Sequence, residues 1–392
     1  MWSPLRVRAP ALKASEELRW VLLRAFAPLG SAVPRGLDAS KIVRLSRDLD
    51  LAARIATRHA ETLVDELGAE AARELSFHRL QVIAVDRVLW ALSDEISSTA
   101  QALGCPVLWM KHAALRRLGL IAEGERAARD VDLLVPQPLA IPLQRALRAR
   151  GFQSAGASSL LHLPPLRRAP GEVVEIHTAL WGIELPEVAR DAAGASAASL
   201  IEGGFVERVA DGSYAPIRPI LAAHAIVHGL VQHRTSPEGY PILRVLSDLC
   251  ALGPLDDDAA KQCQALASHP LAGALTPAAL RLSDVLRRGA DVFDLAANSP
   301  EFELLSHAVA AGIDPAYRRA LRFERIFDVT TPHALQLAFR SAFSTAEDAP
   351  AVGAEQGLPS VTARAGRPVA LALELARGAL SYGALRLKQR AR

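Results

Sequence analysis

The segment Arg129–Val135 constrains the fold more than any other part of the chain. It reads Arg-Asp-Val-Asp-Leu-Leu-Val and is closed by Pro136, which predicts a short buried strand. Side chains alternate between the two faces of a strand, so Asp130 and Asp132 point the same way. Val131, Leu133 and Val135 share the other face and point into the core. The chain therefore places two carboxylates side by side at the start of a buried strand.

Two adjacent carboxylates repel each other, and a divalent cation between them removes the repulsion. Hard oxygen ligands of this kind suit Mg²⁺, which keeps several waters and takes further ligands from substrate phosphates. The alternative is that Asp130 caps a turn or pairs with Arg126 or Arg129, while Asp132 is simply exposed on an edge strand.

A second acidic strand is predicted at Val173–His177, where Glu175 lies among β-branched residues. Alternation puts Glu175 on one face with Val173 and His177. If this strand neighbours the strand of Asp132, Glu175 completes a three-carboxylate cluster, which can hold two cations. The alternative for Glu175 is an ion pair with a nearby arginine.

Composition limits the classes of protein to consider. The net charge of +3 over 392 residues does not indicate a nucleic-acid binder. Cys105, Cys250 and Cys263 are far apart and odd in number, so neither a disulfide framework nor a structural zinc site is expected, and a reducing cytosol fits best. No segment reaches the roughly 20 uninterrupted apolar residues of a membrane helix. A cytoplasmic protein without stable membrane insertion is predicted.

Periodicity divides the chain into five regions. An α+β fold is predicted, with a small mixed-sheet core flanked by N- and C-terminal helical regions. The expected regions are a helical part (1–103), the core (104–185) as the only part with strands, a helical domain (186–344), a flexible linker (345–368) and a basic amphipathic helix (369–392).

Within these regions, apolar spacing and breakers predict individual elements. Strands are expected at Val107–Met110, Leu160–Leu163 and the two acidic segments, and helices at Ala113–Leu120, Leu139–Arg150, Pro219–Gln232 and Leu243–Ala251. The basic helix at the C-terminus could touch a membrane surface weakly or bind nucleic acid, or could dock on the protein with a solvated basic face.

Three segments in order, Trp109–Leu115, Arg126–Val135 and Glu172–His177, resemble the uncharacterised nucleotidyltransferase family of bacteria, within the polymerase-β-like nucleotidyltransferase superfamily. The resemblance implies a short mixed sheet with helices, flanked by helical domains. It also implies transfer of a nucleoside monophosphate from an NTP to an acceptor, which could be a protein side chain, an RNA end or a small molecule.

The resemblance implies roles for five residues. Asp130, Asp132 and Glu175 would bind Mg²⁺ or Mn²⁺, with Glu175 as third ligand or base, and Lys111 and Arg129 would contact phosphate. The chain departs from the family at Lys111-His112, where Lys-Gly is usual, and lacks the Gly-Ser of the broader superfamily. The alternative function is therefore a catalytically impaired nucleotide-binding or partner-binding module on the same fold. For Lys111 itself, an exposed lysine at a strand end is the other interpretation.

Histidines form a further group. His224 and His228 are four residues apart on one predicted helix face, but Ala225 replaces the Glu that a metalloprotease pattern needs, so structural or supporting histidines are expected. The related family tends to carry histidines on this helix and a downstream Asp, which Asp248 matches, and this suggests packing near the active cleft. The strand histidines His162 and His177 could assist proton transfer or be satisfied core residues.

Overall fold

The computed structural model describes residues 9–10, 12–155, 162–169, 171–185, 194–233 and 241–328, with side chains up to residue 321. The helices are α1 Glu16–Phe26, α2 Ala39–Asp48, α3 Ala52–Arg58, α4 Leu63–Leu67, α5 Ala69–Ala102, α6 Lys111–Arg117, α7 Gln137–Ala149, α8 Ala197–Glu202, α9 Arg218–Ala225, the π-helix η1 Ile226–Gln232, α10 Ile242–Leu252, α11 Asp257–Leu266, α12 Pro270–Arg288, the 3-10 helix η2 Val292–Asp294, α13 Pro300–Ile313 and α14 Pro315–Asp328. The strands are β1 Leu108–Trp109, β2 Val131–Leu134, β3 Gln153–Ser154, β4 Leu166–Arg167, β5 Val173–His177, β6 Ala179–Leu180, β7 Ala195–Ser196, β8 Val206–Arg208 and β9 Tyr214–Pro216.

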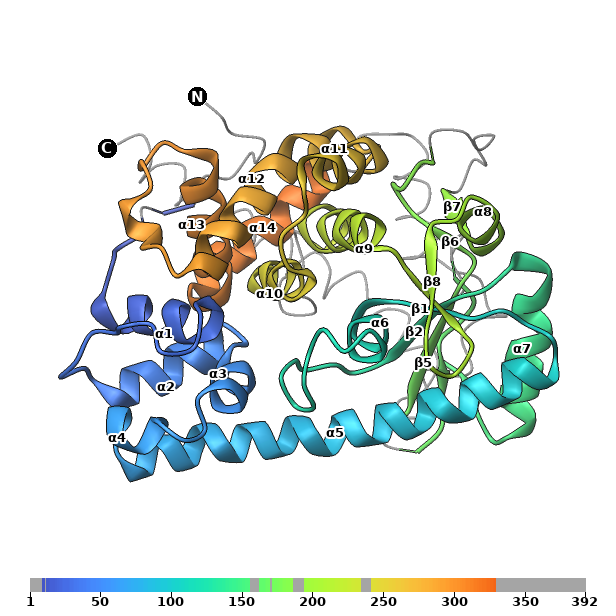
Figure 1. Cartoon of the computed structure of the whole chain (residues 1–392), viewed down its shortest axis with the longest axis horizontal. Coiled ribbons are helices and arrows are strands. Elements are labelled where there is room, and N and C mark those ends of the chain that lie inside the picture. The colour runs from blue at the N-terminus through green and yellow to red at the C-terminus, as the bar shows by residue number, and fades with distance from the viewer. Residues whose placement is uncertain are drawn as a thin grey trace, which may run out of the picture.

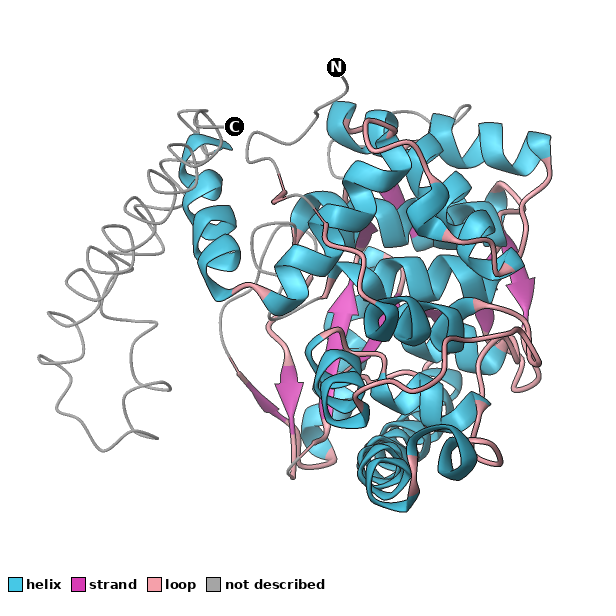
Figure 2. Ribbon diagram, turned by 90° about the vertical axis from the view of Figure 1, so that its left-hand side faces the viewer, coloured by secondary structure: helices cyan, strands magenta, loops and turns pink. Residues whose placement is uncertain are grey.

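A mixed sheet of seven short strands forms the centre of the site-bearing half. Its order is β3-β4-β5-β2-β1-β9-β8. The strand β2 runs antiparallel to β1 and parallel to β5, so it is covered on both edges. All four residues of β2 are buried, whereas β5 alternates between buried and half-buried residues. The predicted α+β class is confirmed, with helical regions before and after the sheet in the sequence. In Figure 1 the N-terminal helices and the C-terminal helices both lie to the left of the sheet, and Figure 2 shows helices and strands in different colours.

The helix α5 connects the N-terminal helices to the sheet. It packs against α3 and α4 and, further along, against α7 and β2, and Figure 1 shows it running the length of the molecule. Leu75, Val82, Leu89 and Ile96 recur every seven residues and are all buried, which gives the helix a continuous apolar face. Buried apolar side chains from α1 through α14 join into a single cluster, so the helical parts and the sheet share one core.

The sheet extends beyond the region predicted to contain all strands. The strands β8 and β9 come from residues 206–216, and β9 pairs in parallel with β1. The expectation that strands end by residue 185 is therefore wrong. Strands of two or three residues carry too little alternation to be recognised, and their pairing with β1 is a long-range contact.

The predicted helix over Pro219–Gln232 is present, but it changes type. It begins as α9 and continues as η1, a π-helix. Such segments are rare and frequently occur at functional sites. The predicted elements near Val107, Ala113, Leu139 and Leu243 are all present, within a few residues of the expected bounds.

Some predictions fall outside the described residues. These are the linker over 345–368, the basic helix over 369–392 and the first half of the strand expected at Leu160–Leu163, of which His162 forms an isolated bridge with His177. Within the described part of the chain, every helix is too short or too polar to cross a bilayer.

Gly124 offers a test of how tightly the segment before β2 is held. Its φ is +74°, and a Cβ there would lie 2.3 Å from Cγ1 of Ile83 on α5. Gly119 has a similar φ of +68° but open space around it. We expect Gly119→Ala to lower the free energy of unfolding by about 1 kcal/mol from the left-handed backbone alone. Gly124→Ala should cost about 1 to 3 kcal/mol more because Ile83 must move. Urea unfolding of both variants measures the difference, and equal losses would show that the contact with α5 is loose.

Candidate active site

The register of two parallel strands brings the predicted carboxylates together. Asp132 of β2 lies directly opposite Glu175 of β5. The Asp132 side chain is 3% exposed and that of Glu175 is 27% exposed, so the Asp132 carboxylate is buried and the Glu175 carboxylate is partly accessible to solvent. The predicted adjacency of the two strands is confirmed, and the interpretation of Asp132 as an exposed edge residue is wrong because β2 is central and covered.

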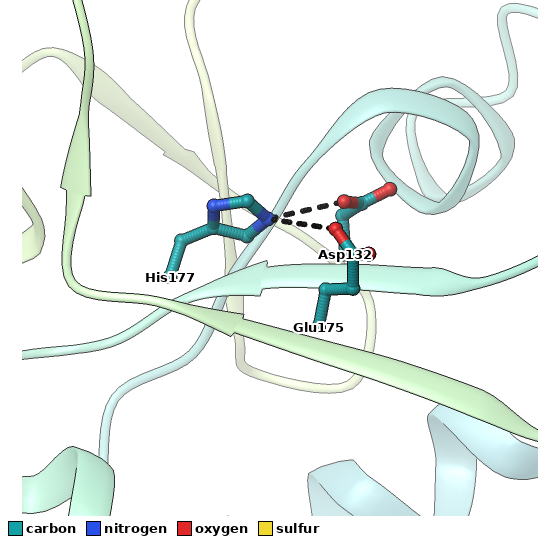
Figure 3. Close-up of side chains that lie close together, drawn as sticks. All are labelled: Asp132, Glu175 and His177. Carbon is teal, nitrogen blue, oxygen red and sulfur yellow. Dashed lines mark hydrogen bonds and ion pairs between the residues drawn. The ribbon is translucent and has the colours of Figure 1, made fainter. Parts of the chain in front are cut away.

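His177 joins this pair. Its Nε2 lies 3.1 Å from Oδ1 of Asp132 and 3.6 Å from Oε2 of Glu175 (Figure 3). One ligand atom from each of the three residues lies within 4.8 Å of the others. From the sequence, His177 had two open interpretations, a group that assists proton transfer or a satisfied core histidine. The available signal was its position two residues after Glu175, on the same face of the strand.

Lys111 fills the space beside Asp132. Its Nζ is 2.7 Å from Oδ1 of Asp132 and its side chain is 10% exposed, so the interpretation as an exposed lysine is wrong. The residue has φ +47°, an uncommon conformation for a side chain of this kind. Such strain persists where surrounding contacts hold it, and here the ion pair with Asp132 does so.

The four groups set each other's charge. Burial alone would raise the pKa of Asp132, but the charges of Lys111 and His177 hold it well below its usual value. The hydrogen bond from His177 lowers the pKa of Glu175. The pKa of His177 is raised, because the hydrogen bonds to the two carboxylates outweigh its burial. The pKa of Lys111 is raised by the surrounding carboxylates despite its burial. All four shifts favour the charged form of the group concerned.

Asp130 stands beside this cluster rather than in it. Burial and then the charge of Asp132 raise its pKa to about 6. Among the described residues, the group close enough to share one ion consists of Asp132, Glu175 and His177, and Asp130 is not part of it. The role of Asp130 as a metal ligand stays a prediction, as do the roles of the other site residues.

Arg126 pairs with Asp248. Its Nε and Nη2 donate to the two oxygens of Asp248 on α10, at 2.5 and 2.9 Å, and both side chains are buried. Asp248 thereby ties α10 to the segment that enters β2. Arg129 is exposed, and no ion pair of its side chain with Asp130 occurs in the described part of the structure. The ion pair of Asp130 with Arg129 that was considered from the sequence is therefore absent from the described contacts.

The helix histidines lie near the cluster, as the resemblance suggested. His224 and His228 stack with ring centroids 5.3 Å apart. Burial, followed by the charges of Lys111 and His177, lowers the pKa of His224 to about 3, and burial with the charge of Lys111 lowers that of His228 well below its usual value. Both imidazoles are neutral near pH 7 and form part of the wall next to Lys111.

His112 occupies the position where glycine is usual in the resembling family. Its Nε2 lies 2.9 Å from Oδ1 of Asp86, and the other oxygen of Asp86 accepts from the backbone N–H of Gly124 at 3.0 Å. The His112 side chain is buried. This contact fixes the start of α6, and therefore Lys111, against α5.

A small mixed sheet with paired carboxylates on neighbouring strands, flanked by helices, defines a nucleotidyltransferase-type core. The chain belongs to the uncharacterised nucleotidyltransferase family, whose model matches residues 35–264, more than half of its length. It is thereby an enzyme of the transferase class.

Two further comparisons add little. No curated protein matches the sequence. Among solved structures, the solution structure of the antibiotic-resistance factor ANT(2'')-Ia matches with 18% identity and a TM-score of 0.34, over 47% of this chain and 91% of that one. A likeness of that size says nothing of substrate or mechanism.

The raised pKa of Asp130 has a consequence for stability. A carboxyl whose pKa is higher in the folded than in the unfolded protein opposes folding once it is ionised. Its effect is absent below about pH 4, grows up to about pH 6 and is complete above it. We therefore expect Asp130→Asn to raise the free energy of unfolding of the metal-free protein at pH 7.5 by about 1 to 3 kcal/mol. The gain should vanish near pH 4.

Thermal and urea unfolding in EDTA at the two pH values test this expectation. Asp258→Asn is the matched control, since its side chain is 95% exposed, and it should change stability by less than about 0.5 kcal/mol. A loss of stability in Asp130→Asn at pH 7.5 would contradict the assignment of a raised pKa.

Proposed function

We propose that the protein transfers a nucleoside monophosphate from an NTP to an acceptor, with Mg²⁺ or Mn²⁺ bound at Asp132 and Glu175. The observation that carries the proposal is the register of β2 and β5, which sets these two carboxylates directly opposite each other. Family membership supports nucleotidyl transfer in general. The metal, the direction of the reaction and the residue roles are our proposal.

The donor set fits a hard divalent cation. Lys111 and His177 both contact Oδ1 of Asp132, and no donor to Oδ2 is recorded among the described residues. That oxygen and an oxygen of Glu175 would form a hard oxygen donor pair that suits Mg²⁺ or Mn²⁺. Such a cation, held by Asp132 and Glu175, would supply positive charge to the phosphates of the nucleotide.

We assign His177 to positioning and not to metal binding. Its Nε2 faces both carboxylates, and its raised pKa favours the protonated ring, which is a donor only. In that form it holds the oxygens of Asp132 and Glu175 in fixed directions. The lowered pKa of Glu175 keeps this residue ionised, as a ligand or as a base towards the acceptor.

Lys111 supplies fixed positive charge next to the cluster. Its ammonium is buried, near Asp130, Asp132 and Glu175. We assign it to the nucleotide phosphates, which it would contact as a point charge on the side of the cluster that Asp132 faces. This replaces the close backbone approach that a glycine-containing turn gives in the broader superfamily.

A second candidate function is a catalytically impaired nucleotide-binding module. The observation that favours it is the ion pair of Lys111 with Asp132, which already satisfies one ligand oxygen, together with the buried His112 at the position of the usual glycine. In such a module nucleotide binding would persist without dependence on the carboxylates. Metal dependence therefore separates the two functions.

The first experiment is a thermal-shift screen of the four NTPs with and without Mg²⁺ or Mn²⁺. We expect one NTP to stabilise the wild type only with metal, by roughly 2.7 kcal/mol at about 100 times its Kd. Asp132→Asn should abolish this shift, while Asp258→Asn on the exposed start of α11 should retain it.

A metal-independent shift that survives Asp132→Asn would favour the binding module. If none of the four NTPs shifted the melting temperature under any condition, both candidate functions would be contradicted. Lys111→Gln gives a further check: removal of the phosphate contact should weaken NTP binding by about tenfold or more, because a charge-assisted hydrogen bond is lost.

A further inference from the structure

A cavity of about 290 Å³ lies among the helices, and one of the residues that line it, Arg129, immediately precedes Asp130 in the chain. Its walls come from the end of α2, the start of α10, the last turn of α13 and the segment just before β2. The residues that line it include Arg47, Asp50, Arg129, Arg244 and Arg318.

The cavity is basic. Four arginines line it against two aspartates, Asp48 and Asp50, which leaves an excess of positive charge. Arg244 contacts Oδ2 of Asp50 at 2.6 and 3.0 Å. Arg47 is paired at the surface with Glu74, and Arg318 donates to backbone carbonyls at the end of α13.

Arg129 differs from the other three. It is exposed, and the part of the chain that the structure describes offers its guanidinium no carboxylate. A guanidinium is planar, always charged and suited to bind a phosphate or carboxylate with two hydrogen bonds. It is therefore the group in this cavity that is available to an anion.

The helices that form the walls of the cavity are tightly packed. A Cβ on Gly312 would lie 2.6 Å from Cδ2 of Leu49 and 3.2 Å from the carbonyl oxygen of Asp48, so α13 approaches the end of α2 as closely as a glycine allows. Asp50 has φ +59° and is held in that conformation by Arg244. The cavity is thus shaped by packing and an ion pair that hold three helices together.

Its position relates it to the proposed reaction. Arg129 lines the cavity and Asp130, the next residue, adjoins the acidic cluster, and consecutive Cα atoms are about 3.8 Å apart. The nucleotide phosphates belong at the cluster beside Lys111. A second anion site one residue away, on the helical side, is where the other substrate of a transfer reaction would be held.

We propose that this cavity binds an anionic group of the acceptor, a phosphate or carboxylate on a small molecule, through Arg129. The assignment rests on the proposed nucleotidyl transfer and names its substrate class. The volume is at the lower end of the range for small-molecule sites, which fits a single small ligand. It also refines the sequence-based prediction for Arg129, since the anion that this residue contacts is then the acceptor and not the NTP.

Inorganic phosphate in EDTA is the probe, because it needs neither the acceptor nor a metal. Calorimetric titration at constant ionic strength should show binding to the full-length wild type and a loss of affinity of about tenfold in Arg129→Gln. Arg129→Lys should lose less, since it keeps the charge without the planar fork. Arg87→Gln is the matched control, because this arginine is 70% exposed on α5, away from the cavity, and should bind phosphate as the wild type does.

A second titration with Mg²⁺ and the NTP separates the two sources of anion. Arg129→Gln should keep the NTP affinity, whereas Asp132→Asn should lose it and keep metal-free phosphate binding. Equal loss of phosphate and NTP binding in Arg129→Gln would overturn the proposal by assigning the cavity to the nucleotide. Unchanged phosphate binding in Arg129→Gln, or no phosphate binding by the wild type, would also overturn it. The proposed function has its own test, which is the NTP titration of the wild type: no binding of the NTP with Mg²⁺ would contradict it.

Discussion

The parallel pairing of β2 with β5 is the constraint on which the site depends. It sets Asp132 opposite Glu175 in the middle of a sheet, where a buried carboxylate is costly unless it is paired. Lys111 and His177 supply the two positive charges that make this burial tolerable. The same balance keeps both carboxylates ionised, which is the form that binds a divalent cation.

The helices around the sheet hold the charged residues in place. Asp86 on α5 accepts from His112 and from the backbone of Gly124, and Asp248 on α10 holds Arg126. These contacts fix the start of α6 and the segment that enters β2. The neutral His224 lies beside Lys111 without competing for its charge. The helical regions thus act as the frame of the charged cluster, and between them lies the basic cavity that we assign to the acceptor.

Local pattern was sufficient for the long or strongly alternating elements. The segments around Asp132 and Glu175 alternate over four or five residues, and the helices near Leu139 and Leu243 have regular apolar spacing, so all four could be predicted. The strands β8 and β9 could not, because each has only three residues, too few to show a period. His177 was left unassigned for a different reason: its role depends on distances to two carboxylates on adjacent strands, one of which is remote in sequence.

The sequence by itself determined the class of the core and the two acidic strands with their carboxylates. Alternation along a strand is a local property, and it fixes which side chains share a face. Only the tertiary structure decided that Lys111 and His177 contact Asp132 and that Arg126 pairs with Asp248. It also decided that Asp130 lies outside the group of Asp132, Glu175 and His177 and has a raised pKa. Those outcomes depend on burial and on distances between residues far apart in the chain, because charge interactions in a protein depend on position and dielectric and not on sequence spacing.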